Sequence, residues 1–171
     1  MALRCLPIAA ATIAACLFFA DASAAEPSSL GRFREWEAYS ATEQGKKICY
    51  TLTSPQKSEG DYAARDPVFL MVTRRPAEDV YDEVSAIGGY TYQAKNQPVF
   101  SIDSKKFVAD AVGDVAWPKL RETPQLVATM RTGSTMELRG TSSRGTQTMD
   151  SFSLLGVSAA LNAIAKSCPN R

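Results

Sequence analysis

Residues 47–53 have the sequence KICYTLT, and this stretch decides the fold class. Its apolar and aromatic residues at positions 48, 50 and 52 alternate with cysteine and threonine, a two-residue period that is typical of a β-strand with one buried face. Further runs rich in β-branched and aromatic residues are separated by clusters of Pro, Gly, Ser and Asp. They cover residues 33–40, 68–74, 80–87, 98–102, 106–112, 135–141 and 146–154. This spacing predicts a mainly β domain.

Two segments follow a helical pattern instead. Thr123 can cap a helix, Pro124 suits its first turn and Gly133 suits its end, which predicts a short internal helix. An apolar stripe with helical spacing, followed by Pro169, predicts a C-terminal helix that lies on the β core. The stripe consists of Val157, Leu161, Ile164 and Cys168. The polar stretches 25–31 and 54–66 are expected to form a flexible lead-in and a mobile surface loop.

The first 24 residues carry the features of a secretory signal peptide. Arg4 precedes an almost wholly apolar stretch at residues 6–20, and Ala22-Ser23-Ala24 forms the small-x-small pattern that signal peptidase cleaves. The apolar stretch would span roughly 22 Å as a helix, short of a bilayer core of about 30 Å, which disfavours a membrane anchor. Residues 13–16 also resemble the motif before a lipidated cysteine, so acylation of Cys16 stays open as a rival.

We therefore expect cleavage near Ala24 and export of a single domain, residues 25–171, with no transmembrane segment in the mature chain. The formal net charge is +1 over 171 residues, so neither nucleic acid nor an anionic membrane is expected as a partner. The chain has no histidine, which excludes serine triads, Cys-His dyads and histidine-ligated zinc. Neither a cofactor nor a metal ion is expected.

Two cysteines, Cys49 and Cys168, remain after the signal peptide is removed. An even pair in an exported protein predicts one disulfide, which would join an early strand to the last helix. The alternative is a pair of free, buried thiols.

Several segments, in their order along the chain, resemble the invasion-associated locus B family of exported bacterial proteins. They are residues 33–39 (FREWEAY), 49–50 (CY), 69–76 (FLMVTRRP), 113–117 (GDVAW) and 140–156 (GTSSRGTQTMDSFSLLG), followed by Ala159-Ala160 and Cys168. The stretch GTSSRGT is the most specific part of the resemblance, which covers nearly all of the mature chain.

This resemblance implies an immunoglobulin-like antiparallel β-sandwich, exported by a Gram-negative bacterium to the periplasm or the outer envelope. Members are named for an association with host-cell invasion, which describes a phenotype rather than a mechanism. The resemblance implies no catalytic residues.

The loop between the last two predicted strands is a candidate binding loop. It consists of Ser142, Ser143, Arg144, Gly145 and Thr146. Its single arginine could bind an anion or a partner's carboxylate through two hydrogen bonds. Two alternatives are a plain hairpin turn, with Gly145 allowing the reversal, and an inward clamp in which Arg144 pairs with Asp150 or another acid.

Aromatic residues form a second candidate surface, made of Tyr90, Tyr92 and Trp117, where a protein or a glycan could bind. The alternative for each ring is packing in the core, which we expect for Trp36. The densest acidic group is Glu78, Asp79, Asp82 and Glu83. Alternation along a strand points these carboxylates to opposite faces, so a solvated edge is expected rather than a catalytic pair or a calcium site.

Three functions remain. The first is a non-catalytic envelope protein that binds a protein partner from the envelope or the host cell. The second is a structural or stress-related periplasmic factor that never meets a host. The third, a hydrolase that uses carboxylates in a cleft, has the least support, because no nucleophile motif accompanies the many serines and threonines.

Overall fold

The computed structural model describes residues 26–170, and the predicted signal peptide, its cleavage site near Ala24 and Cys16 lie outside these residues. Within them, eleven strands form one antiparallel sheet. The strands are β1 (Ser28–Phe33), β2 (Trp36–Glu43), β3 (Lys46–Thr53), β4 (Lys57–Gly60), β5 (Phe69–Arg75), β6 (Val80–Ile87), β7 (Val99–Ile102), β8 (Lys105–Val112), β9 (Val115–Pro118), β10 (Thr135–Thr141) and β11 (Gln147–Ser153). The helices are α1 (Thr123–Met130) and α2 (Val157–Ser167), and the 3-10 turns are η1 (Pro76–Glu78) and η2 (Leu120–Glu122).

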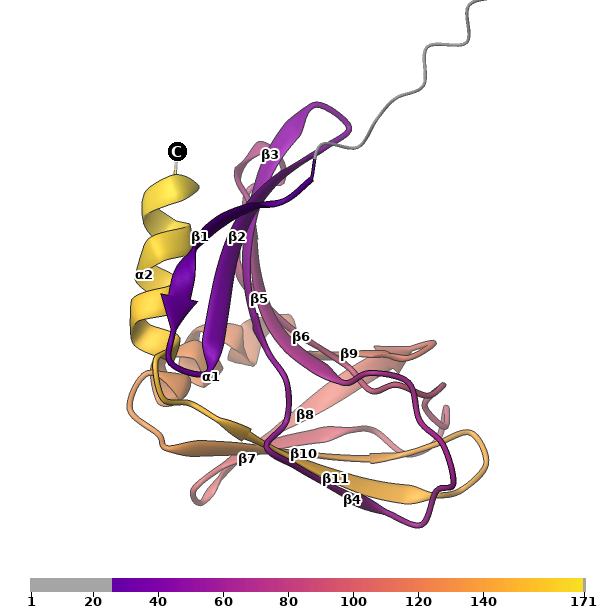
Figure 1. Ribbon diagram of the computed structural model, residues 1–171. Helices are drawn as coiled ribbons and strands as arrows, with labels where there is room; N and C mark the ends of the chain where they lie inside the picture. The colour runs from indigo at the N-terminus through magenta and orange to yellow at the C-terminus, as the bar shows by residue number, and fades with distance from the viewer. Residues whose placement is uncertain (1–25, 171) are drawn as a thin grey trace, which may run out of the picture.

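The sheet has two parts that share one strand order, β1-β2-β3-β5-β6-β9-β8-β7-β10-β11-β4. Strand β8 pairs with β9 on one side and with β7 on the other, and so joins the parts. Figure 1 shows β1, β2, β3 and β5 standing steeply above the layer of β7, β10, β11 and β4, with α2 along one side of the upper part. The mainly β, antiparallel class with a short internal helix and a C-terminal helix is confirmed.

Both parts of the sheet and both helices bury their side chains in one hydrophobic cluster. The largest fully buried side chains are Trp36, Phe100, Phe152, Leu70, Ile102, Leu126, Met130, Met136, Leu138, Leu161, Ile164 and Val72. Trp36 lies in this cluster, as expected, and its indole nitrogen donates a hydrogen bond of 3.0 Å to the carbonyl oxygen of Ser153. A single core therefore holds the two layers together.

The strand with the sequence KICYTLT is β3, and its more deeply buried face carries Cys49, Thr51 and Thr53. The hydroxyl groups of the two threonines donate hydrogen bonds of 2.7 Å each to the carbonyl oxygens of Glu37 and Glu35. These bonds satisfy polar groups that would otherwise be costly to bury.

Three strands lie where the sequence predicted none. Strand β1 occupies most of the expected lead-in at residues 25–31, β4 lies inside the expected mobile loop at residues 54–66, and β9, which contains Trp117, lies outside every predicted strand. Each owes its conformation to a neighbouring strand, β2, β11 or β8, rather than to its own composition. The predicted strand 33–40 is also divided, because the chain turns at Arg34, whose φ is 55°.

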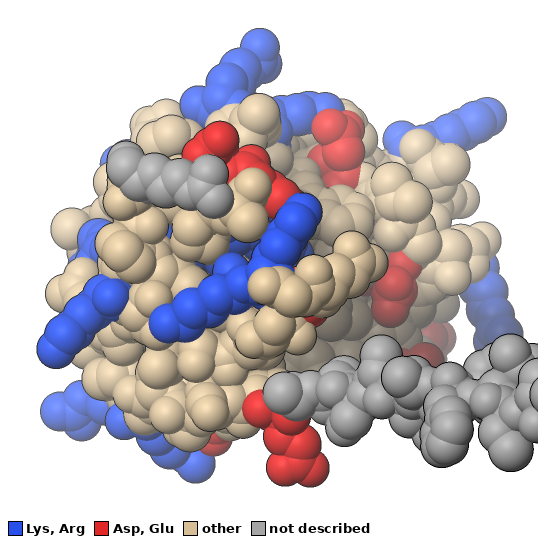
Figure 2. All heavy atoms as spheres, turned by 90° about the horizontal axis from the view of Figure 1, so that it is seen from above, with Lys and Arg blue, Asp and Glu red and all other residues tan. Residues whose placement is uncertain are grey.

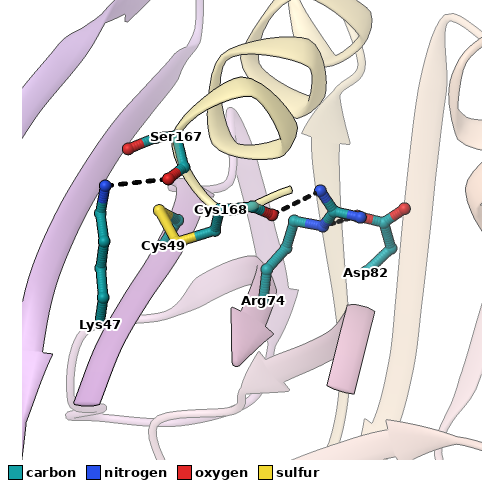
Figure 3. The surroundings of a disulfide bond; sticks show 6 residues. All are labelled: Lys47, Cys49, Arg74, Asp82, Ser167 and Cys168. Carbon is teal, nitrogen blue, oxygen red and sulfur yellow. Dashed lines mark hydrogen bonds and ion pairs between the residues drawn. A yellow bond between two sulfur atoms is a disulfide. The ribbon is translucent and has the colours of Figure 1, made fainter. Parts of the chain in front are cut away.

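A disulfide joins Cys49 of β3 to Cys168 at the end of α2; the two cysteines are 119 positions apart in sequence, and their Cα atoms are 6.0 Å apart. Both cysteines are buried. Polar side chains hold the end of α2 in the same place: Arg74 donates to the carbonyl oxygen of Cys168 at 2.8 Å, and Lys47 to that of Ser167 at 2.9 Å (Figure 3). Cations at this end also suit the helix dipole.

The surface shows no large field of one sign on the face seen in Figure 2, where basic and acidic side chains are interspersed. Among residues 26–170, no helix is long and apolar enough to cross a bilayer.

Candidate functional site

The candidate binding loop is a tight hairpin turn between β10 and β11. Ser142 and Thr146 close the turn, since the amide of Ser142 donates to the carbonyl oxygen of Thr146 at 2.8 Å and the Thr146 amide donates to the Ser142 hydroxyl at 3.2 Å. Gly145 has a φ of 89°, which glycine adopts without strain. Ser142 is buried, whereas Ser143, Arg144 and Gly145 are exposed. The turn therefore presents Arg144 to the solvent.

A second segment, residues 90–93, lies beside this hairpin. Tyr92 forms a β-bridge with Ser142, and the Ser143 amide donates to the carbonyl oxygen of Thr91 at 2.7 Å. The amide of Gln93 donates to the Thr141 carbonyl oxygen at 2.9 Å. These backbone bonds place Tyr90 and Thr91 next to the binding loop.

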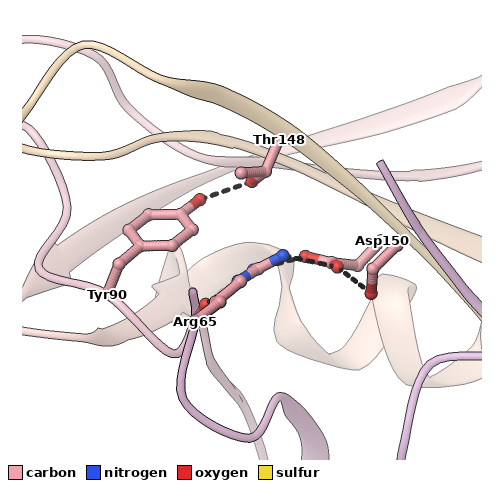
Figure 4. A network of polar contacts seen from close by, with 6 residues as sticks. Arg65, Tyr90, Thr148 and Asp150 are labelled. Atoms are coloured by element: carbon pink, nitrogen blue, oxygen red, sulfur yellow. Dashed lines mark hydrogen bonds and ion pairs between the residues drawn. The ribbon is translucent and has the colours of Figure 1, made fainter. Parts of the chain in front are cut away.

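A third segment, residues 61–66, is tied to the same place by a buried ion pair. Arg65 donates two hydrogen bonds, of 2.8 and 2.7 Å, to the two carboxylate oxygens of Asp150 on β11, as Figure 4 shows. Its Nε donates to the carbonyl oxygen of Gly88 at 2.7 Å, and the Ser58 hydroxyl donates to Asp150 at 2.7 Å. The two side chains are 5% and 0% exposed. Such a pair is favourable only because its geometry and extra hydrogen bonds compensate for lost hydration.

Aromatic rings enclose the guanidinium group of Arg65. It lies 4.7 Å from the centre of the Tyr90 ring and 5.5 Å from that of Tyr62, both within the range of cation–π attraction. The Tyr90 hydroxyl is 2.6 Å from that of Thr148 (Figure 4). Burial opposes the charge on Arg65, but the hydrogen bonds and charge of Asp150 raise the pKa of its guanidinium.

These three segments line one pocket of about 610 Å³, which we call the hairpin pocket. Its lining residues are Asp61, Tyr62, Ala63, Ala64, Arg65, Asp66, Gly89, Tyr90, Thr91, Ser142, Ser143, Arg144, Thr146 and Thr148. The volume lies within the range of about 300–1,000 Å³ that is typical of small-molecule sites. The structure thus brings the predicted loop together with Tyr90, and adds residues 61–66, which belong to the segment expected to form a mobile loop.

Tyr92 and Trp117 do not share this surface with Tyr90, so the predicted aromatic surface is wrong as a unit. Tyr92 is only 6% exposed, and its ring packs edge-on against that of Tyr90 with 5.0 Å between the centres. It fits there because Gly88 and Gly140 have no side chains, and a Cβ atom on either would overlap it. Burial raises the pKa of Tyr92 far above its ordinary value. Trp117 lies half-buried on β9, outside the lining of the pocket.

The predicted inward clamp between Arg144 and Asp150 is also wrong, since Asp150 forms its buried ion pair with Arg65 and Arg144 is exposed. Three members of the acidic group have separate cationic partners. Glu78 pairs with Lys46 at 3.2 Å, Asp82 with Arg74 at 3.0 Å and Glu83 with Arg75 at 2.8 Å. Each of these three carboxylates thus pairs with a different cation. Residues 26–170 contain no cluster of three acids or cysteines that could hold a metal ion.

Sequence reasoning missed Arg65 and Tyr62. The pair Arg65–Asp150 joins residues 85 positions apart, and no local pattern marks either partner. The glycines at 60, 88 and 140 are the signal that could have found the rings, because each leaves room for a tyrosine.

Comparison with known proteins gives one family and one fold. The model of the family described as invasion associated locus B (IalB) protein matches residues 36–165, from the start of β2 into α2. Among solved structures, the crystal structure of invasion associated protein B from Bartonella henselae is similar, with a TM-score of 0.57 and 18% sequence identity. The match covers 82% of this chain and 96% of that one, and it shows a shared fold. No curated protein matches.

Proposed function

The chain belongs to the invasion associated locus B family, and on that premise we propose that it is an exported, non-catalytic binding module of the bacterial cell envelope. The observation that carries the proposal is the hairpin pocket, whose lining includes Arg144 on an exposed turn. Arg144 makes no side-chain hydrogen bond or ion pair with any residue from 26 to 170, so its fork of donors is available to a partner.

The proposed partner is a protein of the envelope or of a host cell that presents a carboxylate to Arg144. The planar guanidinium matches a carboxylate in two parallel hydrogen bonds, which gives orientation as well as attraction. The turn that carries Arg144 is held on both sides, by β10 and β11 and by the bond from Ser143 to Thr91. A turn held in this way loses little freedom on binding.

Two observations support export, and two others support a role without catalysis. The Cys49–Cys168 disulfide suits an oxidising compartment, and the N-terminal pattern suits a signal peptide. The lack of histidine removes the usual general base near neutral pH, and Asp150, the most deeply buried acid of the site, is held by Arg65 and Ser58.

The first experiment asks where the protein meets its partner. Protease is added to intact cells of the native bacterium and to cells with an opened outer membrane. Digestion on intact cells supports contact with a host cell, whereas protection until the membrane is opened supports a periplasmic role without host contact. Recovery of uncleaved precursor in the cytoplasm would contradict export.

The second experiment tests the site. Proteins that cross-link to the purified protein in an envelope extract are compared for the wild type and for Arg144→Ala, Arg144→Lys and Lys166→Ala. Lys166 is an exposed cation on α2 and serves as the matched control. The proposal predicts that Arg144→Ala loses the cross-linked partner, that Arg144→Lys restores it only in part, and that Lys166→Ala keeps it. Equal capture by all four proteins would contradict a role for the pocket.

A further inference from the structure

The hairpin pocket offers free groups of both hydrogen-bonding kinds. Asp61 and Asp66 are exposed, and neither carboxylate has a hydrogen-bond or ion-pair partner among residues 26–170. The hydroxyls of Thr91, Ser143 and Thr146 are likewise unused within the part of the chain that the structure describes. The pocket therefore presents carboxylates that accept hydrogen bonds, the Arg144 guanidinium that donates them, and hydroxyl groups that can donate or accept.

The balance of charge disfavours a simple anion as the ligand of the whole pocket. The positive charge of Arg65 is already matched by Asp150. The free groups are then one guanidinium, that of Arg144, against two carboxylates, so a phosphate or sulfate inside the pocket would meet a net negative wall. A neutral ligand with many hydroxyl groups avoids this repulsion, because each hydroxyl donates to a carboxylate or accepts from the arginine.

The side of the pocket formed by Tyr62, Arg65 and Tyr90 is rigid. Arg65 is fixed by three hydrogen bonds, and the two rings lie against its guanidinium. The Tyr90 hydroxyl is held by Thr148. Aromatic rings give an apolar surface for the C–H groups of a ligand, and a fixed surface lowers the entropy that binding costs.

We propose that the hairpin pocket is a saccharide site, in which Asp61, Asp66 and Arg144 hydrogen-bond the hydroxyl groups of a neutral sugar beside Tyr62 and Tyr90. The pocket of about 610 Å³ holds more than an ion, which fits a sugar unit at the end or edge of a glycan. This inference deepens the proposed binding function, and it rests on that function only for the location of the ligand in the envelope or on a host cell. The glycan could belong to the bacterial envelope or to a host cell, and the chemistry of recognition is the same.

The test uses the purified, disulfide-bonded protein and defined sugars as probes. Glucose, galactose, mannose, N-acetylglucosamine and chitobiose are titrated while ligand and protein signals are followed by NMR. Inorganic phosphate and glucuronate serve as anionic probes. We expect at least one neutral sugar to bind with a Kd of about 1 mM or tighter, and more tightly than either anion.

Variants assign the binding to the pocket. The double variant Asp61→Asn and Asp66→Asn keeps the shape of both side chains and removes both charged acceptors, so we expect at least a tenfold loss of affinity for the sugar. Asp103→Asn is the matched control, because it removes an exposed carboxylate from the β7–β8 turn, outside the pocket, and asparagine tolerates its φ of 52°. Thermal unfolding confirms that each variant is folded.

Each other outcome overturns the inference. If no neutral sugar binds, or if the double variant binds as the wild type does, the pocket is not a saccharide site. If phosphate or glucuronate binds and the neutral sugars do not, the site is an anion site governed by Arg144. In each of these cases, a partner protein whose capture still depends on Arg144 would leave the proposed function standing. Conversely, sugar binding without such a partner protein would support the saccharide site and contradict the proposed binding of a protein.

Discussion

Replacing Asp150 by alanine should be among the most destabilising single changes around the hairpin pocket. The substitution removes three hydrogen bonds, two from Arg65 and one from Ser58, and leaves a guanidinium that is 5% exposed without its counter-charge. Removing one partner of a buried ion pair costs about 3–5 kcal/mol. For a domain of this size, each kcal/mol lowers Tm by about 2–4 °C, so Tm should fall by about 6–20 °C.

The assay is thermal and urea unfolding of the oxidised protein, followed by circular dichroism. The matched control is Glu137→Ala on β10, because the Glu137–Arg139 pair is largely exposed and should contribute no more than about 1 kcal/mol. The double variant Arg65→Met with Asp150→Leu should lose less stability than Asp150→Ala, since it leaves no unpaired charge. If Asp150→Ala costs no more than Glu137→Ala, the pair does not anchor residues 61–66 and the reasoning is refuted.

Three further outcomes follow from the structure. Cys49→Ser should keep the fold but lose about 4–5 kcal/mol of stability on the chain-entropy model, measured by urea unfolding; an intact protein that titrates with two free thiols would contradict the disulfide. Gly156→Ala should lower the free energy of unfolding by about 2–5 kcal/mol, because φ is 97° and the new Cβ would overlap the Phe33 carbonyl oxygen. Gly145→Ala has open space around the new Cβ and should cost only about 1–2 kcal/mol, from its positive φ alone. Equal losses of stability in the two variants would be inconsistent with the overlap at Gly156. Burial raises the pKa of Tyr90, so the folded state holds that proton more tightly than the unfolded chain. The contribution of Tyr90 to stability should be complete below about pH 10 and be lost as pH rises further, so Tyr90→Phe should lose less stability than the wild type above about pH 10, measured by urea unfolding. The same loss in both proteins would argue against this contribution.

Local patterns predicted the long strands and both helices well. Residues 69–72 of β5 are apolar on both faces, and the strand lies between β3 and β6 in the interior of the sheet, as a central strand does. The apolar stripe on α2 faces the core, as predicted. It could be predicted because helical spacing is visible in the local sequence alone. By contrast, β4 has the sequence KSEG, which favours a loop, and becomes a strand only because β11 offers it a free edge.

The site was predictable to the extent that it depends on one turn. Gly145 between two predicted strands marked the hairpin, and the hairpin is present. The pocket beside it depends on Arg65 reaching Asp150 from a distant segment, and on Tyr92 entering a space left by glycines. Such contacts are made between elements that are distant in sequence. The glycines mark space for a ring, but a single sequence does not indicate which tyrosine fills that space, and no local pattern marks Arg65 or Asp150.

The contact between α2 and the first strands has a consequence for the order in which the molecule acquires its structure. Strands β1, β2 and β3 are synthesised first, yet their apolar side is covered by α2, which is synthesised last. Until the last segments of the chain are made, Trp36 lacks its hydrogen-bond acceptor at Ser153, and Cys49 lacks the thiol of Cys168 that completes the disulfide. Contacts of such long sequence separation form slowly, because much chain entropy is lost before they are made. The amino-terminal third of the chain is therefore the part most exposed to premature aggregation, and a chaperone that shields it until residue 168 has been released would raise the yield of folded protein.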